Sequence, residues 1–357
     1  MQSIEVPEAD QLEGMALPRE QSVLFGHKEA ELKLLNAYKS SRFHHAWILG
    51  GPKGTGKATL AFRFAKFVLA NPDRFGLEVQ SAVNLNVPAQ SHNARMVSAG
   101  SHADLLHLRR PWNEKSKRFM RDLPVSEVRK TVRFFGSTSA GGQWRVCLID
   151  AADDMNANAA NALLKILEEP PENCVFLVLS HSPGRLLPTI RSRCRRLDMR
   201  KLNDNQLLEA LSFYEAFHDG EPEKTKALLT LANGSLRNAF IALESGGLEL
   251  AAKFNSLTVH LPQLDMREAH SFAEQVSAHG ADDLWISFLD LIRNFLSLQV
   301  GKGTDMPAKH LVCWTDLWEK VGNAAGATDA LNLDRKQVVL SFLIELREVS
   351  RRNTGIS

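Results

Sequence analysis

Apolar residues form short uninterrupted runs in the first 200 residues of the chain. AWILG at 46–50, WRVCLID at 144–150 and CVFLVLS at 174–180 are predicted strands, and RRLDM at 195–199 is a fourth. Short runs that are apolar throughout are typical of strands buried on both faces. Residues 71–110 show no clear period, and their clusters of Asn, Pro, Ser and Gly predict mostly loop.

Two of these runs are followed by segments in which apolar residues recur at helical spacing. In KATLAFRFAKFVLA at 57–70, apolar residues recur at Leu60, Phe64, Phe67 and Val68. In NANAANALLKILEEPP at 156–171, one face carries Ala160, Leu163, Leu164 and Leu167, and the two prolines end the helix. Strands that alternate with helices predict a parallel sheet covered by helices on both faces.

Beyond about residue 200 the pattern becomes helical. NDNQLLEALSFYEAF begins with Asp204 as a candidate N-cap, Gly234 breaks a later helical stretch, and helical spacing continues from about 262 to 351. We therefore predict an α/β core at 1–200, a small helical domain at 201–255 and an all-helical C-terminal domain at 256–357.

Composition narrows the class of protein. With 43 Lys+Arg against 41 Asp+Glu among 357 residues, overall charge does not indicate nucleic acid or membrane, so such binding would depend on local patches. The four cysteines lie far apart, which argues against a disulfide framework and favours a reducing compartment. The acidic first twenty residues do not resemble a signal peptide, and no apolar run approaches a membrane span. We expect a cytoplasmic protein.

GGPKGTGKAT at 50–59 lies between a predicted strand and a predicted helix, the context of a phosphate-binding loop. Glycines let backbone N–H groups converge on phosphate oxygens, while a helix N-terminus and a lysine add positive charge. The predicted nucleotide-binding residues are Gly51, Pro52, Lys53, Gly54, Thr55, Gly56, Lys57, Ala58 and Thr59. The alternative is a glycine-rich turn with an exposed lysine, and the strand–loop–helix context favours the nucleotide loop.

Two groups that hydrolysis requires are absent from this pattern. The position after Lys57 usually carries the hydroxyl that binds Mg²⁺, but here it is Ala58, and Thr59 comes one position late. The strand-end Asp150 is followed by Ala151 where a water-orienting Glu is usual. We predict weak ATP binding through the loop backbone and Lys57, without Mg²⁺-dependent turnover and without a resident metal.

NALLKILEEPPENCVFLVLSHSPGRLLPTIRSRC at 161–194 resembles the signature block of bacterial clamp-loader subunits of the AAA+ class, most closely the delta-prime subunits of DNA polymerase III. LFGH at 24–27, HHAWILGGPKGTGK at 44–57 and GSLRNAF at 234–240 match the same family in order and spacing. The resemblance implies an AAA+ core, a helical lid and a C-terminal collar. It also implies a subunit that completes the five-subunit ring that loads the sliding clamp onto primed DNA.

The family's functional positions can be carried over to particular residues. The resemblance implies that Arg193 is an arginine finger for the neighbouring subunit's ATP. It places Arg237 at the sensor-2 position facing this chain's own nucleotide, and Ser180 near sensor 1. Arginine suits the first two roles because its forked charge stabilises phosphoryl transfer. The alternative for Arg193 is a solvated basic face with Arg191, Arg195 and Arg196, and for Arg237 an ordinary helix-surface arginine.

The sequence departs from the family between residues 71 and 100. Many relatives carry a four-cysteine zinc module there, before a stretch that corresponds to SHADL at 101–105, but this chain has no cysteine in that range, so we expect no zinc. A DNA-contacting patch is suggested by Arg109, Arg110, Lys115, Lys117, Arg118 and Arg121, with Trp112 between them. A solvated charged loop is the commoner explanation of such a run. In the C-terminal region, core or subunit contacts are expected from Trp285, Phe288, Phe295, Trp314 and Trp318.

Three functions were compared on these residues. The first is a non-hydrolysing delta-prime-like subunit that works with gamma/tau-like and delta-like partners, the sliding clamp and primed DNA, and with no membrane. The second is an active gamma/tau-like ATPase of the same loader, which Ala58 and Ala151 disfavour. The third, a nucleotide kinase or unrelated phosphate-loop enzyme, would leave the 161–194 block and the helical C-terminal region unexplained.

Overall fold

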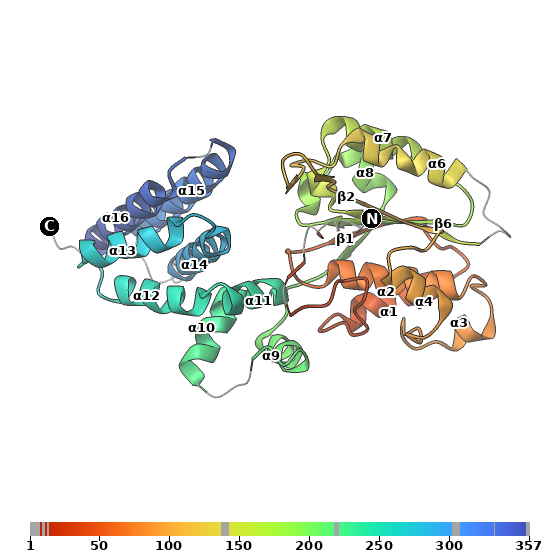
Figure 1. Ribbon diagram of the computed structural model, residues 1–357, viewed down its shortest axis with the longest axis horizontal. Helices are drawn as coiled ribbons and strands as arrows, with labels where there is room; N and C mark the ends of the chain where they lie inside the picture. Colours follow the sequence, from red (N-terminus) through yellow and green to blue (C-terminus); the bar gives the residue numbers. More distant parts are fainter. Residues whose placement is uncertain are drawn as a thin grey trace. The chain divides into compact units, whose positions relative to one another are not determined.

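Figure 1 shows the computed structural model of the protein. It describes residues 8, 11–12, 14–136, 143–217, 221–301, 308–331 and 333–354. The chain divides into two compact units. The first comprises Met1–Tyr214 with Gly234–Leu236, and the second comprises Glu215–Asn233 with Arg237–Ser357. The predicted division into a core, a lid and a collar remains a prediction.

A five-stranded parallel sheet organises the first unit. Its strand order is β2-β5-β6-β1-β7, formed by β2 (Leu105–Arg109), β5 (Arg145–Asp150), β6 (Cys174–Ser180), β1 (Ala46–Gly50) and β7 (Arg195–Asp198). Every pairing in it is parallel, which confirms the predicted sheet. Gly50 pairs in register with both Ser180 and Asp198, and Arg109 pairs with Asp150, so these strand ends meet at one edge.

Helices cover both faces of this sheet (Figure 1). One face is covered by α1 (Lys28–Lys39), α2 (Lys57–Ala70), α3 (Leu77–Ser81) and α4 (His92–Ser98). The other is covered by α6 (Lys130–Gly136), α7 (Ala157–Glu168) and α8 (Pro188–Arg193), and by α5 (Val125–Val128), whose Val128 packs in the same core as Leu163 of α7. Alternate strand residues feed the two cores, because neighbouring side chains in a strand point to opposite faces. Leu49 and Leu148 pack in the α1–α2 core, whereas Ile48 and Ile149 pack in the α7–α8 core.

One local prediction was incomplete and another was wrong. Residues 71–110 are mostly loop, as predicted, but they also contain α3, α4 and the edge strand β2, which were not predicted. The N-cap of α9 (Asp204–Phe213) is Asn203 and not Asp204. The Asn203 side chain accepts from the Gln206 backbone N–H at 2.9 Å, and the Gln206 side chain accepts in return from the Asn203 N–H at 3.0 Å. This reciprocal capping box fixes the start of the helix one residue earlier than predicted.

The elements described in the second unit are all helices: α10 (Pro222–Ala232), α11 (Leu236–Glu244, of which Leu236 groups with the first unit), α12 (Gly247–Val259), α13 (Met266–Ser277), α14 (Asp282–Gly301), α15 (Ala308–Leu331) and α16 (Arg335–Thr354). Trp285, Phe288 and Trp314 are buried in it, as predicted for core residues. Phe295 is half-buried, and Trp318 is 38% exposed. Within the described residues, no helix is both long and apolar enough to cross a membrane.

Candidate functional site

The predicted phosphate loop joins β1 to α2 at the carboxyl edge of the sheet. Lys57 is the first residue of α2 and is only 4% exposed. Its Nζ donates to the carbonyl oxygens of Gly51 at 2.7 Å and Pro52 at 2.6 Å. The Thr55 hydroxyl donates to the same Pro52 carbonyl at 3.0 Å. The loop therefore closes around its own lysine.

Backbone contacts hold the loop from three sides. The Gly51 N–H donates to the Ser180 carbonyl at 3.1 Å, and the Met199 N–H donates to the Gly50 carbonyl at 2.7 Å. The Leu236 N–H donates to the Gly54 carbonyl at 3.1 Å. A Cβ at Gly51 would clash with the Met199 carbonyl oxygen, so the close approach of these two backbones requires glycine.

The residues present fit a phosphate group better than a magnesium ion. A glycine loop with a buried lysine at a helix start supplies N–H donors and positive charge for phosphate oxygens. Ala58 offers only a methyl group where a Mg²⁺-binding hydroxyl is usual. Across the part of the chain that the structure describes, no group of three or more His, Cys, Asp or Glu side chains is placed to hold a metal ion.

The strand-end carboxylate Asp150 has a histidine beside it. His107 Nε2, from the neighbouring strand β2, lies 3.8 Å from Asp150 Oδ2. The next residue, Ala151, is buried with its methyl at the cavity wall, so no carboxylate follows Asp150 directly.

Asp153, three residues on, has a structural role at the end of β6. Its Oδ1 accepts from the Ser180 hydroxyl at 3.1 Å and from the Ser182 N–H at 2.9 Å, and its Oδ2 accepts from the His181 N–H at 2.6 Å. Ser180, the residue expected near sensor 1, is fully buried at this point. Burial lowers the pKa of His181, and the positive charge of Lys57 lowers it further, which favours the neutral imidazole.

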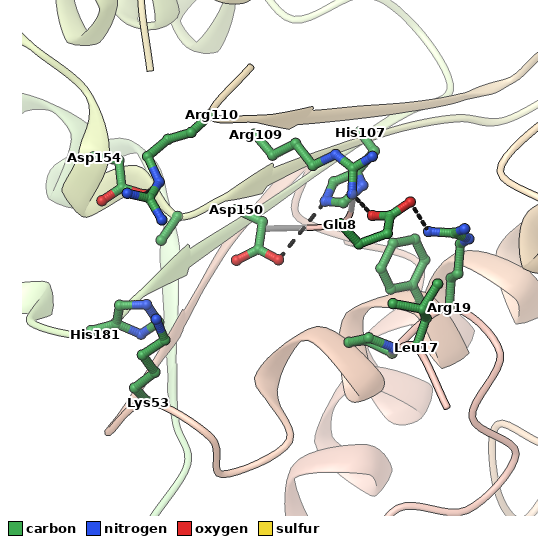
Figure 2. A pocket seen from close by; sticks show the side chains of 13 residues that line it. Glu8, Leu17, Arg19, Lys53, His107, Arg109, Arg110, Asp150, Asp154 and His181 are labelled. Carbon is green, nitrogen blue, oxygen red and sulfur yellow. Dashed lines mark hydrogen bonds and ion pairs between the residues drawn. The ribbon is translucent and has the colours of Figure 1, made fainter. Parts of the chain in front are cut away.

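A cavity of about 190 Å³ lies beside the phosphate loop (Figure 2). It is lined by Lys53 from the loop, by Asp150, by the guanidinium groups of Arg19, Arg109 and Arg110, and by the imidazoles of His107 and His181. Glu8 also lines it and forms ion pairs with Arg19 and Arg109. Glu8 and Arg19 were not predicted as site residues, because their segment carries no motif or period that marks it.

A sequence model of the family described as "DNA polymerase III, delta subunit" matches residues 26–203. Over this range, the chain is similar to that family of DNA polymerase III subunits. The delta-prime subunit of Pseudomonas aeruginosa is 37% identical over 191 residues, which are 54% of this chain and 53% of that protein. The delta-prime subunit of Bacillus subtilis is 29% identical over 76% of this chain and 77% of its own length.

The tau subunit of Escherichia coli DNA polymerase III is also similar, with 29% identity over 71% of this chain and 38% of that protein. The chain thus spans about half of the Pseudomonas relative and less than half of tau. The family match and the higher identity to a delta-prime subunit favour the delta-prime type over the tau type within DNA polymerase III subunits.

Arg193 is the last residue of α8, and it is paired within the chain. Its Nη2 lies 2.7 Å from Glu168 Oε1, and its Nη1 donates to the Thr189 carbonyl at 3.0 Å. Its arginine neighbours have other partners: Arg196 pairs with Asp198 at 2.7 Å, and Arg195 lies over the Trp47 ring at 5.4 Å. Both Arg193 and Glu168 are more than a third exposed, so their pairing contributes little and can be exchanged at small cost.

Arg237 is the second residue of α11 and is half-buried in the second unit. Its sensor-2 role therefore remains a prediction carried by the family resemblance.

The basic run that follows β2 forms a hairpin. Strands β3 (Trp112–Asn113) and β4 (Arg118–Phe119) pair in antiparallel fashion, and the Trp112 and Phe119 rings pack edge-on with centroids 5.0 Å apart. At its base, Arg110 pairs with Asp154 at 3.2 Å, while Arg109 is held by Glu8. The remaining cations are exposed and have no ion-pair partner in the described parts of the chain: Lys115, Lys117, Arg118 and Arg121.

Proposed function

We propose that this chain is a delta-prime-type subunit of a DNA polymerase III clamp loader. In this role it occupies one position of a five-subunit ring, beside gamma/tau-like ATPase subunits and a delta-like subunit, in the cytoplasm. The ring loads a sliding clamp onto primed DNA. This chain does not hydrolyse ATP itself, and it provides Arg193 to the ATP of a neighbouring subunit.

One combination of features carries the proposal. The chain's own nucleotide loop lacks two groups that hydrolysis requires, while Arg193 lies at the surface, where a neighbouring subunit could use it. Ala58 and Ala151 remove the Mg²⁺-binding hydroxyl and the water-orienting carboxylate from the chain's own site. Arg193 meanwhile ends a helix at the surface, where its partner Glu168 is itself 48% exposed. A guanidinium in such a place can leave a weak surface pair and enter a neighbour's site.

The proposal includes binding of ATP through its phosphates. The loop geometry and Lys57 support this binding, with no contribution from a Mg²⁺-binding hydroxyl.

The C-terminal helices are proposed to contact other subunits. Five large apolar side chains are exposed on α14, α15 and α16 and support this role: Ile286, Leu298, Val312, Trp318 and Ile344.

The alternative is an active tau/gamma-like ATPase of the same loader. The similarity to E. coli tau favours it, and the two missing catalytic groups oppose it.

Arg193→Ala in the reconstituted clamp loader tests the proposal. Arginine fingers contribute on the order of 10³–10⁵ in rate in other NTPases, but several ATP sites dilute the loss of one. We expect a several-fold loss of the clamp- and DNA-stimulated ATPase rate and slower clamp loading, with ring assembly unchanged. Arg193→Lys should rescue little, because lysine lacks the guanidinium fork.

The matched control is Arg191→Ala, since Arg191 is exposed on the same helix. Equal small effects of the two alanine variants would mean that α8 carries only a basic surface. Turnover by the isolated chain that Lys57→Ala abolishes would instead favour the tau/gamma-like alternative.

A further inference from the structure

The Glu8 carboxylate is divided between two guanidinium groups in the cavity beside the phosphate loop (Figure 2). Its Oε1 accepts from Arg19 Nη1 at 2.7 Å, and its Oε2 forms an ion pair with Arg109 Nη1. The Glu8 side chain is only 16% exposed, against 19% for Arg19 and 33% for Arg109. Carboxylate oxygens shared by two arginines in a partly buried place form a charge-assisted contact.

Each arginine is positioned by contacts that do not involve Glu8. Arg19 Nε donates to the Ser98 carbonyl at 2.9 Å, and the Ser98 hydroxyl donates back to the Arg19 carbonyl at 3.1 Å. Arg109 is the last residue of β2, in register with Asp150 of β5. Removal of the Glu8 carboxylate would therefore leave the Arg19 guanidinium held by Ser98 and the Arg109 side chain anchored by its backbone at the end of β2.

The charge of the cavity depends on this one carboxylate. Arg110 and Asp154 neutralise each other at 3.2 Å. The remaining charged lining consists of Lys53, Arg19 and Arg109 against Asp150 and Glu8. Without Glu8 the excess of positive charge in the cavity would grow, with three cations against Asp150 alone. Burial already lowers the pKa of Arg109, so an anion there would be stabilised.

We propose that Arg19 and Arg109 form an oxyanion site that Glu8 fills as an internal ligand, and that a phosphate group displaces Glu8 from it. A phosphate suits the site because two arginines can each donate to its oxygens, as they now donate to the carboxylate. The site is separate from the loop lysine Lys57, which does not line this cavity. The proposal requires neither ATP turnover nor ring assembly.

Titration calorimetry of the full-length chain with inorganic pyrophosphate tests the proposal. Glu8→Gln keeps the size of the side chain but removes its charge, and we expect pyrophosphate to bind about tenfold more tightly than to the wild type. Either Arg19→Gln or Arg109→Gln, added to Glu8→Gln, should abolish this gain. Thermal unfolding will show whether each arginine variant is folded. If one of them is unstable, the other still tests the proposal.

Two controls separate the arginine site from the phosphate loop. Glu29→Gln removes an exposed carboxylate from α1 in the same unit and should not change pyrophosphate affinity. Lys57→Ala, added to Glu8→Gln, should weaken nucleotide binding but leave the pyrophosphate gain in place. The proposal would be overturned if Glu8→Gln did not increase the affinity for pyrophosphate. It would also be overturned if Lys57→Ala abolished that increase and the arginine variants did not.

Discussion

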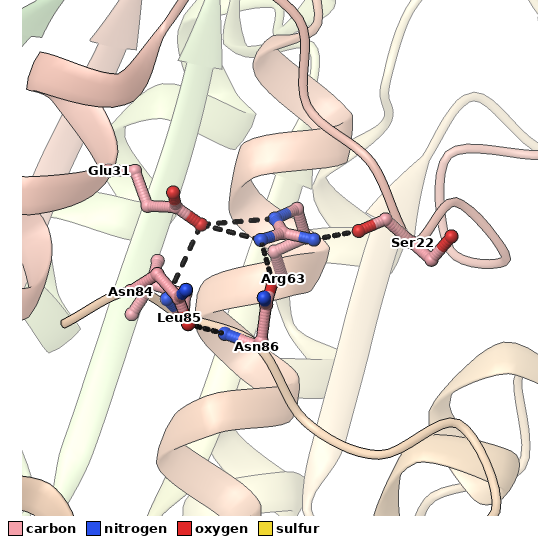
Figure 3. Close-up of polar contacts among 6 residues, drawn as sticks. All are labelled: Ser22, Glu31, Arg63, Asn84, Leu85 and Asn86. Atoms are coloured by element: carbon pink, nitrogen blue, oxygen red, sulfur yellow. Dashed lines mark hydrogen bonds and ion pairs between the residues drawn. The ribbon is translucent and has the colours of Figure 1, made fainter. Parts of the chain in front are cut away.

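Arg63 of α2 and Glu31 of α1 form an ion pair in the interior of the first unit (Figure 3). Arg63 donates to Glu31 Oε1 from Nη2 at 2.6 Å and from Nε at 3.2 Å, and their side chains are 8% and 11% exposed. The guanidinium also contacts the Ser22 carbonyl and donates to Asn86 Oδ1 at 2.6 Å. One side chain thus ties the phosphate-loop helix to three other segments.

Removing one partner of this pair should destabilise the protein strongly. Arg63→Met leaves the Glu31 carboxylate buried without its main partner, and we expect a loss of about 3–5 kcal/mol in the free energy of unfolding. Urea unfolding measures it. The double variant Arg63→Met with Glu31→Met should cost less than the sum of the singles, whereas Lys224→Ala, at an exposed pair with Glu221, should cost under about 1 kcal/mol. Additive costs would show that the two residues are not coupled.

The isolated chain should hydrolyse ATP negligibly, and two substitutions should restore part of the activity in the assembled ring. Ala58→Thr supplies the Mg²⁺-binding hydroxyl, and Ala151→Glu supplies the carboxylate that orients water. Ala151 lines the cavity but is 3% exposed, so the variant's folding is checked by thermal unfolding. A phosphate-release assay should detect turnover with the double variant and little with either single variant. No gain would show that a further part of the site is unsuited to hydrolysis.

Asp153 should matter for stability and not for catalysis. Asp153→Ala removes one acceptor from the Ser180 hydroxyl and from the backbone N–H groups of His181 and Ser182. We expect the free energy of unfolding, measured by heat or urea, to fall by about 1–2 kcal/mol. This is a low value for the loss of three hydrogen bonds, because Asp153 is exposed to water. Asp122→Ala, at another exposed carboxylate, is the control. An equal and negligible effect of both would contradict the anchoring role.

The hairpin cations offer a test of DNA contact. Four substitutions to alanine are made together, at Lys115, Lys117, Arg118 and Arg121. If these side chains contact phosphates, the affinity of the assembled loader for primed DNA should fall. The slope of log affinity against log salt should also become shallower by up to about 4. Fluorescence anisotropy at several salt concentrations measures both quantities.

A matched control removes the same charges elsewhere in the first unit. Two lysines and two arginines are exposed and lack an ion-pair partner in the described chain: Lys28, Lys33, Arg42 and Arg95. Their replacement by alanine should leave the salt slope unchanged. Identical slopes for the hairpin variant and the wild type would favour the solvated loop over a DNA contact.

The sequence predicted the elements whose burial in the fold is visible as a local pattern of apolar residues. The strands 46–50 and 174–180 are buried at every position, so an apolar run identified each of them with its bounds. The edge strand β2 was missed because it alternates polar and apolar side chains, with His107 and Arg109 at the cavity. An edge strand is paired on one side only, so its sequence resembles that of a polar loop.

The candidate site was predictable only where a contiguous motif marks it. The loop from Gly51 to Lys57 is such a motif, and the structure places it beside Asp150 and Ser180 at the sheet edge. The pairing of Glu8 with Arg109 joins residues about a hundred positions apart, and the partner of Arg193, Glu168, lies on a different helix. No local pattern encodes such pairs, because tertiary folding alone brings them together.

Gly51 is required by packing, independently of any nucleotide chemistry of the loop. The Met199 backbone leaves no room for a side chain at this position, so packing between the start of the loop and the end of β7 requires glycine whether or not a nucleotide is bound. A glycine at position 51 is therefore not by itself evidence that the loop binds a nucleotide. Ala58 and Ala151 therefore bear on hydrolysis more directly than the glycines do, because they lie where the Mg²⁺-binding hydroxyl and the water-orienting carboxylate are usual.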